Sequence, residues 1–430
     1  MTTAERRHIG AFTAATMLVG LVVGVSIFIL PGELAATAGP GVLLAYAIAG
    51  AVAFVGCLVA AEVGAVLPVS GASFVLISRC VSPFAGFLAL WLMIGAICTA
   101  MALLAYGFAD YFALLVPGVP ALPMALGIVA LLGALNVFGT RTALLSQNVF
   151  VFLMMAALVA FCAVGATYVD VSNLQPFLPR GLDAAIGAAV PAFFSFAGFM
   201  LIVEIGGEVK NPARNIPLAV LAAFAVVLVT YLAVAFVVVG VEHWSNLAGV
   251  SAPVGVLAQR FMPGWGANLV VVTALLATLT SLNGILLGYA RDLLALARAG
   301  LLPARFARLN VRGEPMWAMM LMTFLSLAAI LASATLLEYA TLVVIAAMVL
   351  QMLLAVAVWR MPQVLGSEYA AAAFRLPRGA REVVIVVLFA SSAYLFWRGL
   401  RDASQLSGAL AAFAAAGVVY YGARRWWISR

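Results

Sequence analysis

The segment Met17-Leu-Val-Gly-Leu-Val-Val-Gly-Val-Ser-Ile-Phe-Ile-Leu-Pro31 is hydrophobic but carries small residues at its centre. A second such segment, Phe193-Phe-Ser-Phe-Ala-Gly-Phe199, leads into Glu208-Val-Lys-Asn-Pro-Ala-Arg-Asn-Ile-Pro217 in the other half of the chain. A helix opened at membrane depth exposes N–H and C=O groups that lipid cannot satisfy. Paired breaks at corresponding positions of two halves are typical of a transporter's substrate site. The sequence therefore predicts a membrane carrier.

The composition excludes a water-soluble globular protein. The chain has 430 residues, of which 66% are hydrophobic and 9% are charged, whereas soluble domains carry roughly 25% charged residues. The formal net charge is +7, but the basic residues are scattered between apolar runs, so we expect membrane topology and no nucleic-acid partner. Four cysteines lie in or beside apolar stretches without metal-ligand spacing, as expected of small buried side chains.

Apolar runs long enough to cross a hydrocarbon core of about 30 Å recur along the chain. With the N-terminus placed inside, all but four of the 22 basic residues fall on the inner side, the exceptions being Arg180, Arg260, Arg398 and Arg401. The positive-inside rule then places both termini in the cytoplasm and predicts a multi-pass protein of the plasma (inner) membrane. The twelve expected spans are 11–38, 41–67, 83–115, 122–138, 144–169, 187–206, 216–240, 266–297, 316–334, 336–359, 381–399 and 405–424.

The two interrupted spans are the first and the sixth. Five spans separate their starts, so the second half would enter the bilayer upside down relative to the first. The sequence predicts an all-α membrane protein with a 5+5 inverted repeat and broken helices 1 and 6. The first repeat would be 1–180 and the second 181–360, while 361–430 would hold two extra C-terminal helices used for packing or oligomer contact.

The broken helices suggest the chemistry of a ligand. At Gly24-Val25-Ser26 a half-helix would point free N–H groups and its positive dipole end into the cavity, which favours a carboxylate. At Ser195-Phe-Ala-Gly198 unpaired carbonyls would suit an ammonium group. Donors and acceptors together fit a zwitterionic α-amino acid. The alternative is that these glycines only allow close helix packing, which is common in membranes.

Four motifs in order resemble the amino acid–polyamine–organocation permeases, and in particular their amino acid transporters. They span most of 11–360 and are Phe28-Ile-Leu-Pro-Gly32, Glu62-Val-Gly-Ala-Val-Leu-Pro-Val-Ser-Gly-Ala-Ser73, the stretch from Phe193 to Pro217, and Gly288-Tyr-Ala-Arg-Asp-Leu-Leu-Ala-Leu-Ala-Arg-Ala-Gly-Leu-Leu-Pro303. The resemblance implies the LeuT-type fold and secondary active transport of an amino acid, of which a neutral one is preferred, by alternating access.

The resemblance also implies roles for individual residues. The backbone around the first break, at Gly24, Val25, Ser26 and Ile27, would hold the substrate carboxylate. Carbonyls around Val22, Phe194, Ala197 and Gly198 would hold the amine, and Phe194 falls where the family places an aromatic gate. Glu208 retains the second acid of a usual acidic pair.

Inserting a charged side chain at the centre of a membrane helix costs about 2.5–3.5 kcal/mol, so each such residue is a candidate for a functional or structural role. Asp110 lies toward the outer end of its span, where we expect water to reach it. Glu204 could carry a proton or contact a cationic substrate, or it could be a solvated acid of the inner vestibule. Glu62 is expected to pair with Arg79 or with a loop group. Asp110, Glu204 and Glu208 are the gating and coupling candidates.

The coupling ion is left open between Na⁺ and H⁺, and no other cofactor is expected. Thr280 and Ser281, with Ala277 one turn earlier, supply oxygens of the kind that hard cations take. Such hydroxyls also commonly bond back to their own helix or to a neighbouring helix, which is the competing interpretation. Uncoupled exchange is a third alternative.

Other classes of protein fit less well. An intramembrane zinc protease needs convergent histidines, and the chain has only His8 and His243, both at span ends. The repeated polar stripes of a channel are not found. A polyamine or organic-amine carrier of the same fold remains an alternative, although such a substrate would favour several acids around the site. The exact substrate and the oligomeric state are not readable from the sequence.

Overall fold

A computed structural model describes residues 9–24, 26–69, 71–137, 144–200, 203, 206–310, 313–332, 334–402 and 407–428. This part of the chain is helical, and its only extended contact is an isolated bridge between Ile9 and Val209. The α-helices are α1 Ala11–Val23, α2 Ser26–Ala38, α3 Val42–Val66, α4 Ala72–Cys80, α5 Pro83–Ala113, α6 Ala121–Val137, α7 Leu144–Gly165, α8 Gly181–Phe193, α10 Pro212–Val241, α11 Pro253–Phe261, α12 Gly264–Arg298, α13 Met316–Leu331, α14 Leu336–Val364, α15 Gly366–Ala371, α16 Arg378–Asp402 and α17 Ser407–Ile428.

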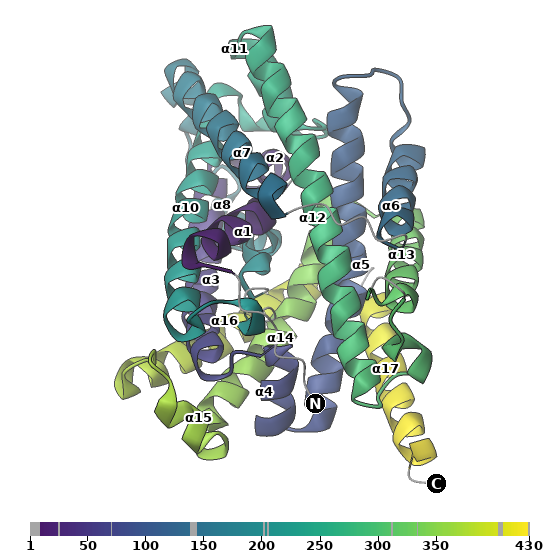
Figure 1. Ribbon diagram of the computed structural model, residues 1–430. Helices are drawn as coiled ribbons and strands as arrows, with labels where there is room; N and C mark the ends of the chain where they lie inside the picture. Colours follow the sequence, from purple (N-terminus) through teal and green to yellow (C-terminus); the bar gives the residue numbers. More distant parts are fainter. Residues whose placement is uncertain are drawn as a thin grey trace.

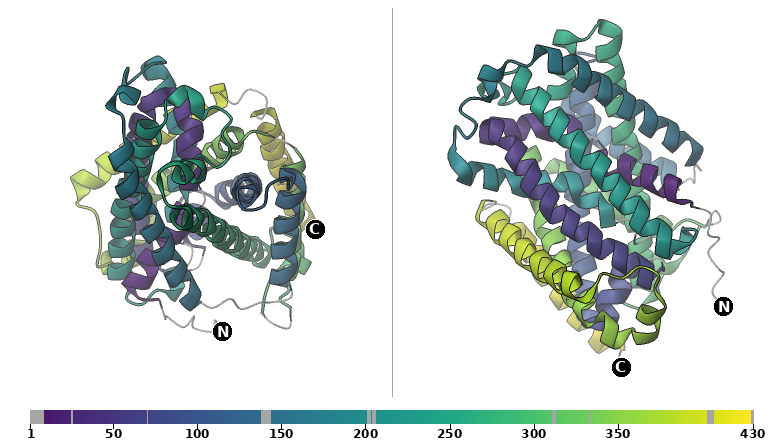
Figure 2. Two further views of the ribbon diagram at one scale, coloured as in Figure 1. Left: turned by 90° about the horizontal axis from the view of Figure 1, so that it is seen from above. Right: turned by 90° about the vertical axis from the view of Figure 1, so that its left-hand side faces the viewer.

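In the described part of the chain, short 3₁₀ helices join or extend these elements: η1 Gly39–Gly41, η2 Ala166–Tyr168, η3 Val171–Leu174, η4 Phe194–Met200, η5 Gly206–Glu208, η6 Trp244–Leu247 and η7 Ala304–Ala307. The helices pack side by side into one bundle (Figure 1). Figure 2 shows α12 crossing this bundle obliquely in the view from above.

The helices are long and apolar enough to make this a multi-pass membrane protein. Eight described segments meet the length and hydropathy expected of a span, and one of them, Ser26–Val66, contains α2 and α3. The helices α1, α6 and α13 are apolar but shorter. An all-helical membrane protein is thus confirmed, while the count of twelve spans stays a prediction.

Both segments expected to be interrupted are interrupted. The first span is divided into α1 and α2. Gly24 between them has φ 40° and ψ −147°, a backbone conformation that would be strained in a residue with a side chain. In the sixth span α8 ends at Phe193 and the chain continues as the 3₁₀ helix η4. Helix α8 begins six residues before 187, where the sixth span was expected to start, because Gly181, with φ 78°, turns the chain into α8.

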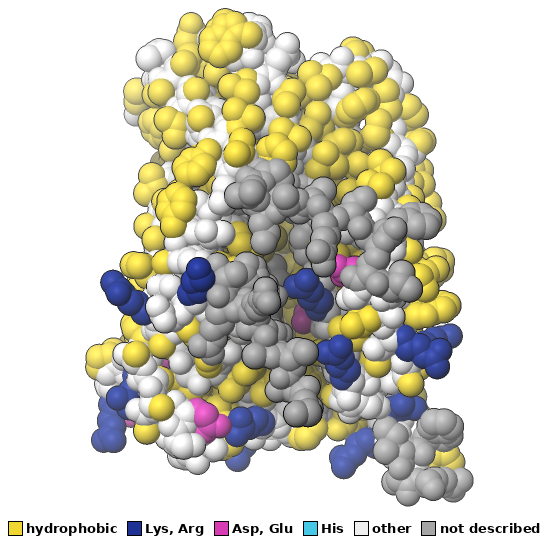
Figure 3. All heavy atoms as spheres, viewed as in Figure 1, with side chains coloured by type: hydrophobic (Ala, Val, Ile, Leu, Met, Phe, Trp, Pro, Cys, Tyr) yellow, Lys and Arg dark blue, Asp and Glu magenta, His cyan; other side chains and the backbone are white. Residues whose placement is uncertain are grey.

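The two ends of the bundle differ in charge. We call the end formed by α4, α15 and the C-terminal ends of α12 and α14 the basic end; it carries Arg79, Arg298 and Arg360. Figure 3 shows the Lys and Arg side chains of the visible face in its lower half, beneath an apolar upper half. The opposite end carries α11 and is called the far end.

The short helices α4, α11 and α15 lie between the expected spans and were not predicted. Each has nine residues or fewer, which is too short to cross a hydrocarbon core. Their sequences mix polar and apolar residues, so a search for long apolar runs does not find them. They pack against the ends of the bundle, where α11 covers α2 at the far end and α15 contacts α3 and α14 at the basic end.

An ion pair buried at the basic end joins α3 to α16. The Glu62 side chain is 0% exposed, and its Oε1 lies 3.3 Å from Nε of Arg381, whose side chain is 9% exposed. The Tyr369 hydroxyl donates to the same carboxylate at 3.2 Å, and Arg381 also donates to the Val358 carbonyl. Of the two expected partners of Glu62, Arg79 is wrong, because it pairs with Glu368. The other expectation, a loop group, is confirmed, since the backbone of Leu376 between α15 and α16 also hydrogen-bonds the Glu62 carboxylate.

A second ion pair anchors α16 at the far end. The Arg398 guanidinium donates to both carboxylate oxygens of Asp183, at 2.6 and 2.7 Å, and its Nε donates to Asp402. Asp183 lies in the first turn of α8. Because α16 also lies along α3 (Figure 2), it bridges two helices that are distant in sequence.

The Glu62–Arg381 pair predicts a stability difference. Arg381→Met should leave the Glu62 carboxylate buried without its cation, which typically costs about 3–5 kcal/mol. Thermal unfolding of the purified protein in detergent would show a lowered Tm, and Arg381→Met combined with Glu62→Leu should recover much of it. The matched control is Arg79→Gln, which breaks an exposed pair worth about 0–1 kcal/mol. Equal Tm shifts for Arg381→Met and Arg79→Gln would contradict the assignment.

Candidate functional site

A cavity lies at the break between α1 and α2. It contains about 580 Å³ of space, part of it open to solvent. Six elements enclose it: α1, α2, α5, η4, α12 and α14. We call it the central cavity, and its lining residues are Leu21, Val22, Gly24, Ser26, Met93, Ile97, Ala100, Leu104, Phe194, Ala197, Gly198, Ser281, Ile285, Tyr289 and Val343.

The N-terminus of α2 opens into this cavity. Ser26 is the first residue of α2 and lines the cavity with a side chain that is 4% exposed. The first N–H groups of a helix have no partner within the helix, and the positive end of its dipole lies there. With 13 residues, α2 is long enough for this effect. The break therefore presents hydrogen-bond donors suited to a carboxylate.

The C-terminus of α1 is capped by a tyrosine from another helix. The Tyr231 hydroxyl of α10 lies 3.2 Å from the Val23 carbonyl oxygen and 3.4 Å from that of Val22. The Ser26 hydroxyl donates to the Val23 carbonyl at 3.0 Å and is also hydrogen-bonded to Tyr231. Tyr231 is fully buried and stacks on Tyr46 of α3, with ring centroids 5.2 Å apart. Carbonyls freed by the break are thus satisfied by side chains, as an apolar surrounding requires.

The second break lies directly against the first. A Cβ atom added at Gly198 in η4 would come within 3.0 Å of Cγ2 and 3.4 Å of Cα of Val22. A side chain at this position would require Val22 to shift by a few tenths of an ångström, so glycine favours the close approach of η4 to α1. Phe194, the first residue of η4, is half-buried and lines the cavity together with Ala197 and Gly198.

The remaining walls are apolar. Met93, Ile97, Ala100 and Leu104 come from one face of α5, and Ile285 and Val343 come from α12 and α14. The described lining residues include no Asp, Glu, Lys or Arg. Such a wall stabilises an uncharged apolar group and offers no charge to a second ammonium group.

Of the three residues considered for a sodium site, only Ser281 lines the cavity. It is 2% exposed, its hydroxyl has no hydrogen-bond partner within the described structure, and a Cβ at Gly24 would lie 2.7 Å from its Oγ. Thr280 instead donates to the Ala277 carbonyl at 2.9 Å. The hydroxyl of Thr280 is therefore engaged in its own helix, as the competing interpretation proposed.

The other predicted residues lie elsewhere. Ile27 is fully buried and does not line the cavity. Asp110 is not a lining residue either; it lies toward the far end of α5, where its carboxyl group interacts electrostatically with that of Glu33. Val25, Glu204 and the side chain of Glu208 lie outside the described residues.

Tyr231 and the α5 wall were missed by the sequence analysis. A signal for Tyr231 did exist, because a tyrosine in the middle of the apolar stretch Pro212–Val241 needs a hydrogen-bond partner when buried. No comparable signal marks Ile97 or Ala100, which are ordinary residues of an apolar helix. Which face of α5 meets the break is decided by packing.

The sequence is similar to known permeases. A family model described as "Amino acid permease" matches residues 9–400. A branched-chain amino acid permease of Lactococcus lactis is 29% identical over 410 residues, covering 88% of this chain and 86% of the relative. A branched-chain amino acid permease of Bacillus subtilis is 28% identical over 71% of this chain and 70% of its own length. A methylthioribose transporter of B. subtilis is 29% identical with the same coverage.

The cap on α1 predicts a measurable effect. Tyr231→Phe keeps the ring but leaves the Val22 and Val23 carbonyls with one donor fewer, which should cost about 1–3 kcal/mol of stability. The same variant should weaken substrate binding, since the break loses its fixed geometry. Thermal unfolding and ligand binding in detergent would check both effects.

Tyr420→Phe is the matched control for this prediction. The Tyr420 hydroxyl is also buried but has no hydrogen-bond partner within the described residues, so its removal should leave the Tm unchanged or raise it. A Tyr231→Phe protein as stable as Tyr420→Phe, with unchanged ligand affinity, would show that the hydroxyl does not hold the break.

Proposed function

This chain belongs to the amino acid permease family of the amino acid–polyamine–organocation superfamily, and from that premise we propose that it transports neutral apolar amino acids by alternating access. The names of the family and of the relatives given above describe transporters and not enzymes. Substrate would bind in the central cavity between the broken helices. It would reach the two sides of the membrane in turn.

The central cavity supports this proposal most directly. It combines the free N–H groups of the α2 N-terminus with a wall of uncharged, mostly apolar side chains. A carboxylate would bind at α2, near Gly24 and Ser26. The ammonium group would face the carbonyls around Leu21, Val22 and η4. The side chain of the substrate would lie against Ile97, Ala100 and the rest of the apolar wall.

Branched aliphatic side chains fit this wall best. Leucine, isoleucine and valine present only carbon to it, and each buried methylene contributes about 0.8 kcal/mol. The branched-chain permeases among the relatives agree with this choice. We therefore take L-leucine as the test substrate.

The architecture is proposed to be the LeuT-type 5+5 inverted repeat, with 1–180 and 181–360 as the two repeats and α16 and α17 outside them. The two breaks meet at the cavity, as two inverted halves with discontinuous helices would arrange them. By the positive-inside rule the basic end would face the cytoplasm across the plasma membrane.

A polyamine or organic-amine carrier is the alternative. An extra ammonium group would need an acid in the cavity wall. The described lining residues of the central cavity contain none. This favours the neutral substrate.

Uptake into proteoliposomes tests the proposal. We expect labelled L-leucine to be taken up and to be displaced by isoleucine and valine but not by putrescine. Ala100→Leu adds three carbons to a cavity wall that is only 1% exposed, so it should lower leucine affinity by about tenfold or more. Gly127→Ala in α6, where a Cβ meets nothing within 4 Å, is the control. Uptake of putrescine but not of leucine would reverse the assignment.

Transport is proposed not to depend on a sodium gradient, because the Thr280 hydroxyl is already bonded to the Ala277 carbonyl. Initial leucine uptake should be the same in sodium and in choline buffers. Ser281→Ala should change the affinity for leucine equally in both buffers. A sodium-stimulated uptake that Ser281→Ala abolishes would instead establish a cation site at the break. Uptake driven by a pH gradient would identify H⁺ as the coupling ion, and its absence would indicate exchange.

A further inference from the structure

Among the described residues that line the central cavity, Ser281 in α12 carries a buried hydroxyl without a hydrogen-bond partner. Its side chain is 2% exposed, and no group of the described structure bonds to its Oγ. The Ser26 hydroxyl, by contrast, donates to the Val23 carbonyl, and Tyr289 also has an interaction within the structure. Burying an unused hydroxyl is unfavourable, so a ligand that accepts a hydrogen bond from Ser281 gains free energy.

The neighbouring residue Thr280 accounts for this free hydroxyl. Serine and threonine hydroxyls within helices commonly bond back to a carbonyl one turn earlier. For Ser281 the carbonyl four residues earlier is that of Ala277, and Thr280 already donates to it at 2.9 Å. The Ser281 hydroxyl is therefore left for a group in the cavity.

The Ser281 hydroxyl lies directly beside the first break. A Cβ atom added at Gly24 would come within 2.7 Å of its Oγ. Gly24 is two residues before Ser26, the first residue of α2. The N–H groups at this end of α2 have no partner within the helix, and the positive end of the helix dipole lies there. A hydroxyl donor from α12 and N–H donors from α2 thus meet at the same part of the cavity.

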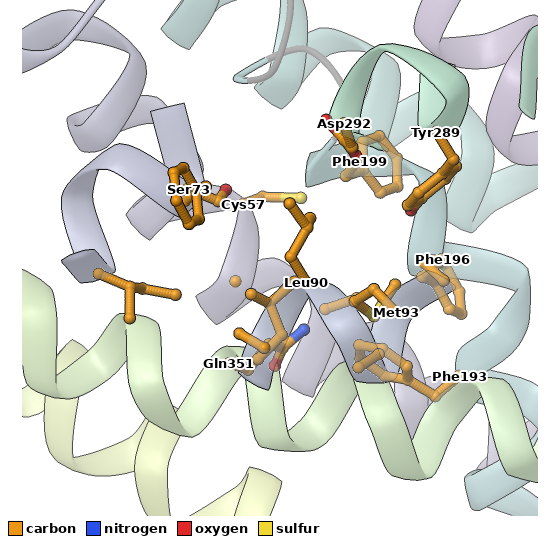
Figure 4. Close-up of a pocket in the computed structure, with 18 of the residues that line it drawn as sticks. Cys57, Ser73, Leu90, Met93, Phe193, Phe196, Phe199, Tyr289, Asp292 and Gln351 are labelled. Carbon is orange, nitrogen blue, oxygen red and sulfur yellow. The ribbon is translucent and has the colours of Figure 1, made fainter. Parts of the chain in front are cut away.

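The described walls supply no anion to these donors. The lining residues of the central cavity include no Asp or Glu within the described part of the chain. A second cavity, lined in part by α4, shares Met93, Ala197 and Tyr289 with the central cavity and is also lined by Asp292 (Figure 4). Asp292 does not line the central cavity, and it already has an interaction of its own. An acceptor for the donors at the break would therefore come from a ligand.

Of the groups in an amino acid, the carboxylate fits these donors best. It only accepts hydrogen bonds, and its two oxygens together offer about four lone-pair sites. One oxygen can bind N–H groups of α2 while the other accepts from Ser281. An ammonium group only donates, so it would leave the hydroxyl hydrogen of Ser281 unused.

We propose that Ser281 is a substrate-binding residue whose hydroxyl donates to the carboxylate of the amino acid, alongside the N-terminus of α2. This inference rests on the proposed function for the place where the substrate binds. It names a side chain that makes the site selective for ligands with a free carboxylate. Of the adjacent pair, Thr280 bonds to its own helix and Ser281 bonds to the substrate.

Competition binding with ligands that differ by one group tests the assignment. Tritiated L-leucine bound to the purified full-length protein would be displaced by leucine, by isocaproate, which lacks the ammonium group, and by isoamylamine, which lacks the carboxylate. Ser281→Ala should lower the affinities for leucine and isocaproate by about tenfold or more, because a hydrogen bond to a charged group is lost. The affinity for isoamylamine should stay as in the wild type.

The matched control is Ser78→Ala in α4. The Ser78 hydroxyl is likewise buried without a partner within the described structure, but Ser78 lines neither cavity. This variant should leave all three affinities unchanged. Thermal unfolding checks that both variants are folded, and neither should have a lower Tm, because no existing hydrogen bond is removed.

Three results would overturn the role of Ser281. An equal loss of affinity for isoamylamine would show that the hydroxyl acts on the shape of the cavity and not on the carboxylate. A loss of leucine affinity confined to sodium buffer would show that Ser281 binds a cation. An unchanged affinity for leucine would remove Ser281 from the site.

These outcomes are separate from those of the proposed function. Leucine uptake into proteoliposomes together with any of the three results would leave the transport function standing and overturn only the role of Ser281. Binding that responds to Ser281→Ala as expected, without leucine uptake, would overturn the transport function and leave the role of Ser281 in binding.

Discussion

The uncovered backbone between α1 and α2 is the constraint on which the rest of the structure depends. In hydrocarbon each unsatisfied peptide group costs several kcal/mol, so the break at Gly24 can exist only if other elements supply partners. Tyr231 from α10 supplies them to the Val22 and Val23 carbonyls, and Ser26 adds a bond within the break. Tyr46 of α3 stacks on Tyr231 and holds its ring in place. The first N–H groups of α2 have no partner within their own helix and therefore remain for a ligand.

At the far end of the bundle another buried tyrosine hydroxyl bonds backbone groups of two helices. The Tyr111 hydroxyl in α5 donates to the Phe28 carbonyl of α2 at 2.7 Å and accepts from the Gly255 N–H of α11 at 3.2 Å. Gly32 of α2 lies so close to Pro253 that a Cβ would approach its ring to 2.4 Å. This packing covers the half-helix α2 at the far end, while the second cavity, which residues of α4 line, lies toward the basic end. For the far end to open, α2 would have to separate from both α5 and α11 and exchange these bonds.

The sequence predicted those features that are local. Gly24 and the small residues from Ser195 to Gly198 mark the breaks because small residues within an apolar run have a direct backbone consequence. The sequence did not predict contacts between residues that are distant in the chain and are brought together by folding. Tyr231 is more than 200 residues from Val22, and Glu62 meets Arg381 rather than the nearer Arg79. The apolar wall from α5 was also missed, since residues of the same type line the cavity, the core and the lipid face.

Helix α16, which precedes the C-terminal helix α17, has a larger structural role than the packing or oligomer contact expected from the sequence. Arg381 joins it to α3 at the basic end, and Arg398 joins it to α8 at the far end. α8 leads into η4, the wall shared by both cavities. If η4 moves when substrate passes, α8 must either carry α16 with it or release the bidentate contact between Arg398 and Asp183. Since α16 is also held to α3 by a buried charge that is costly to expose, movement of α3, α8 and α16 as one unit is energetically preferred.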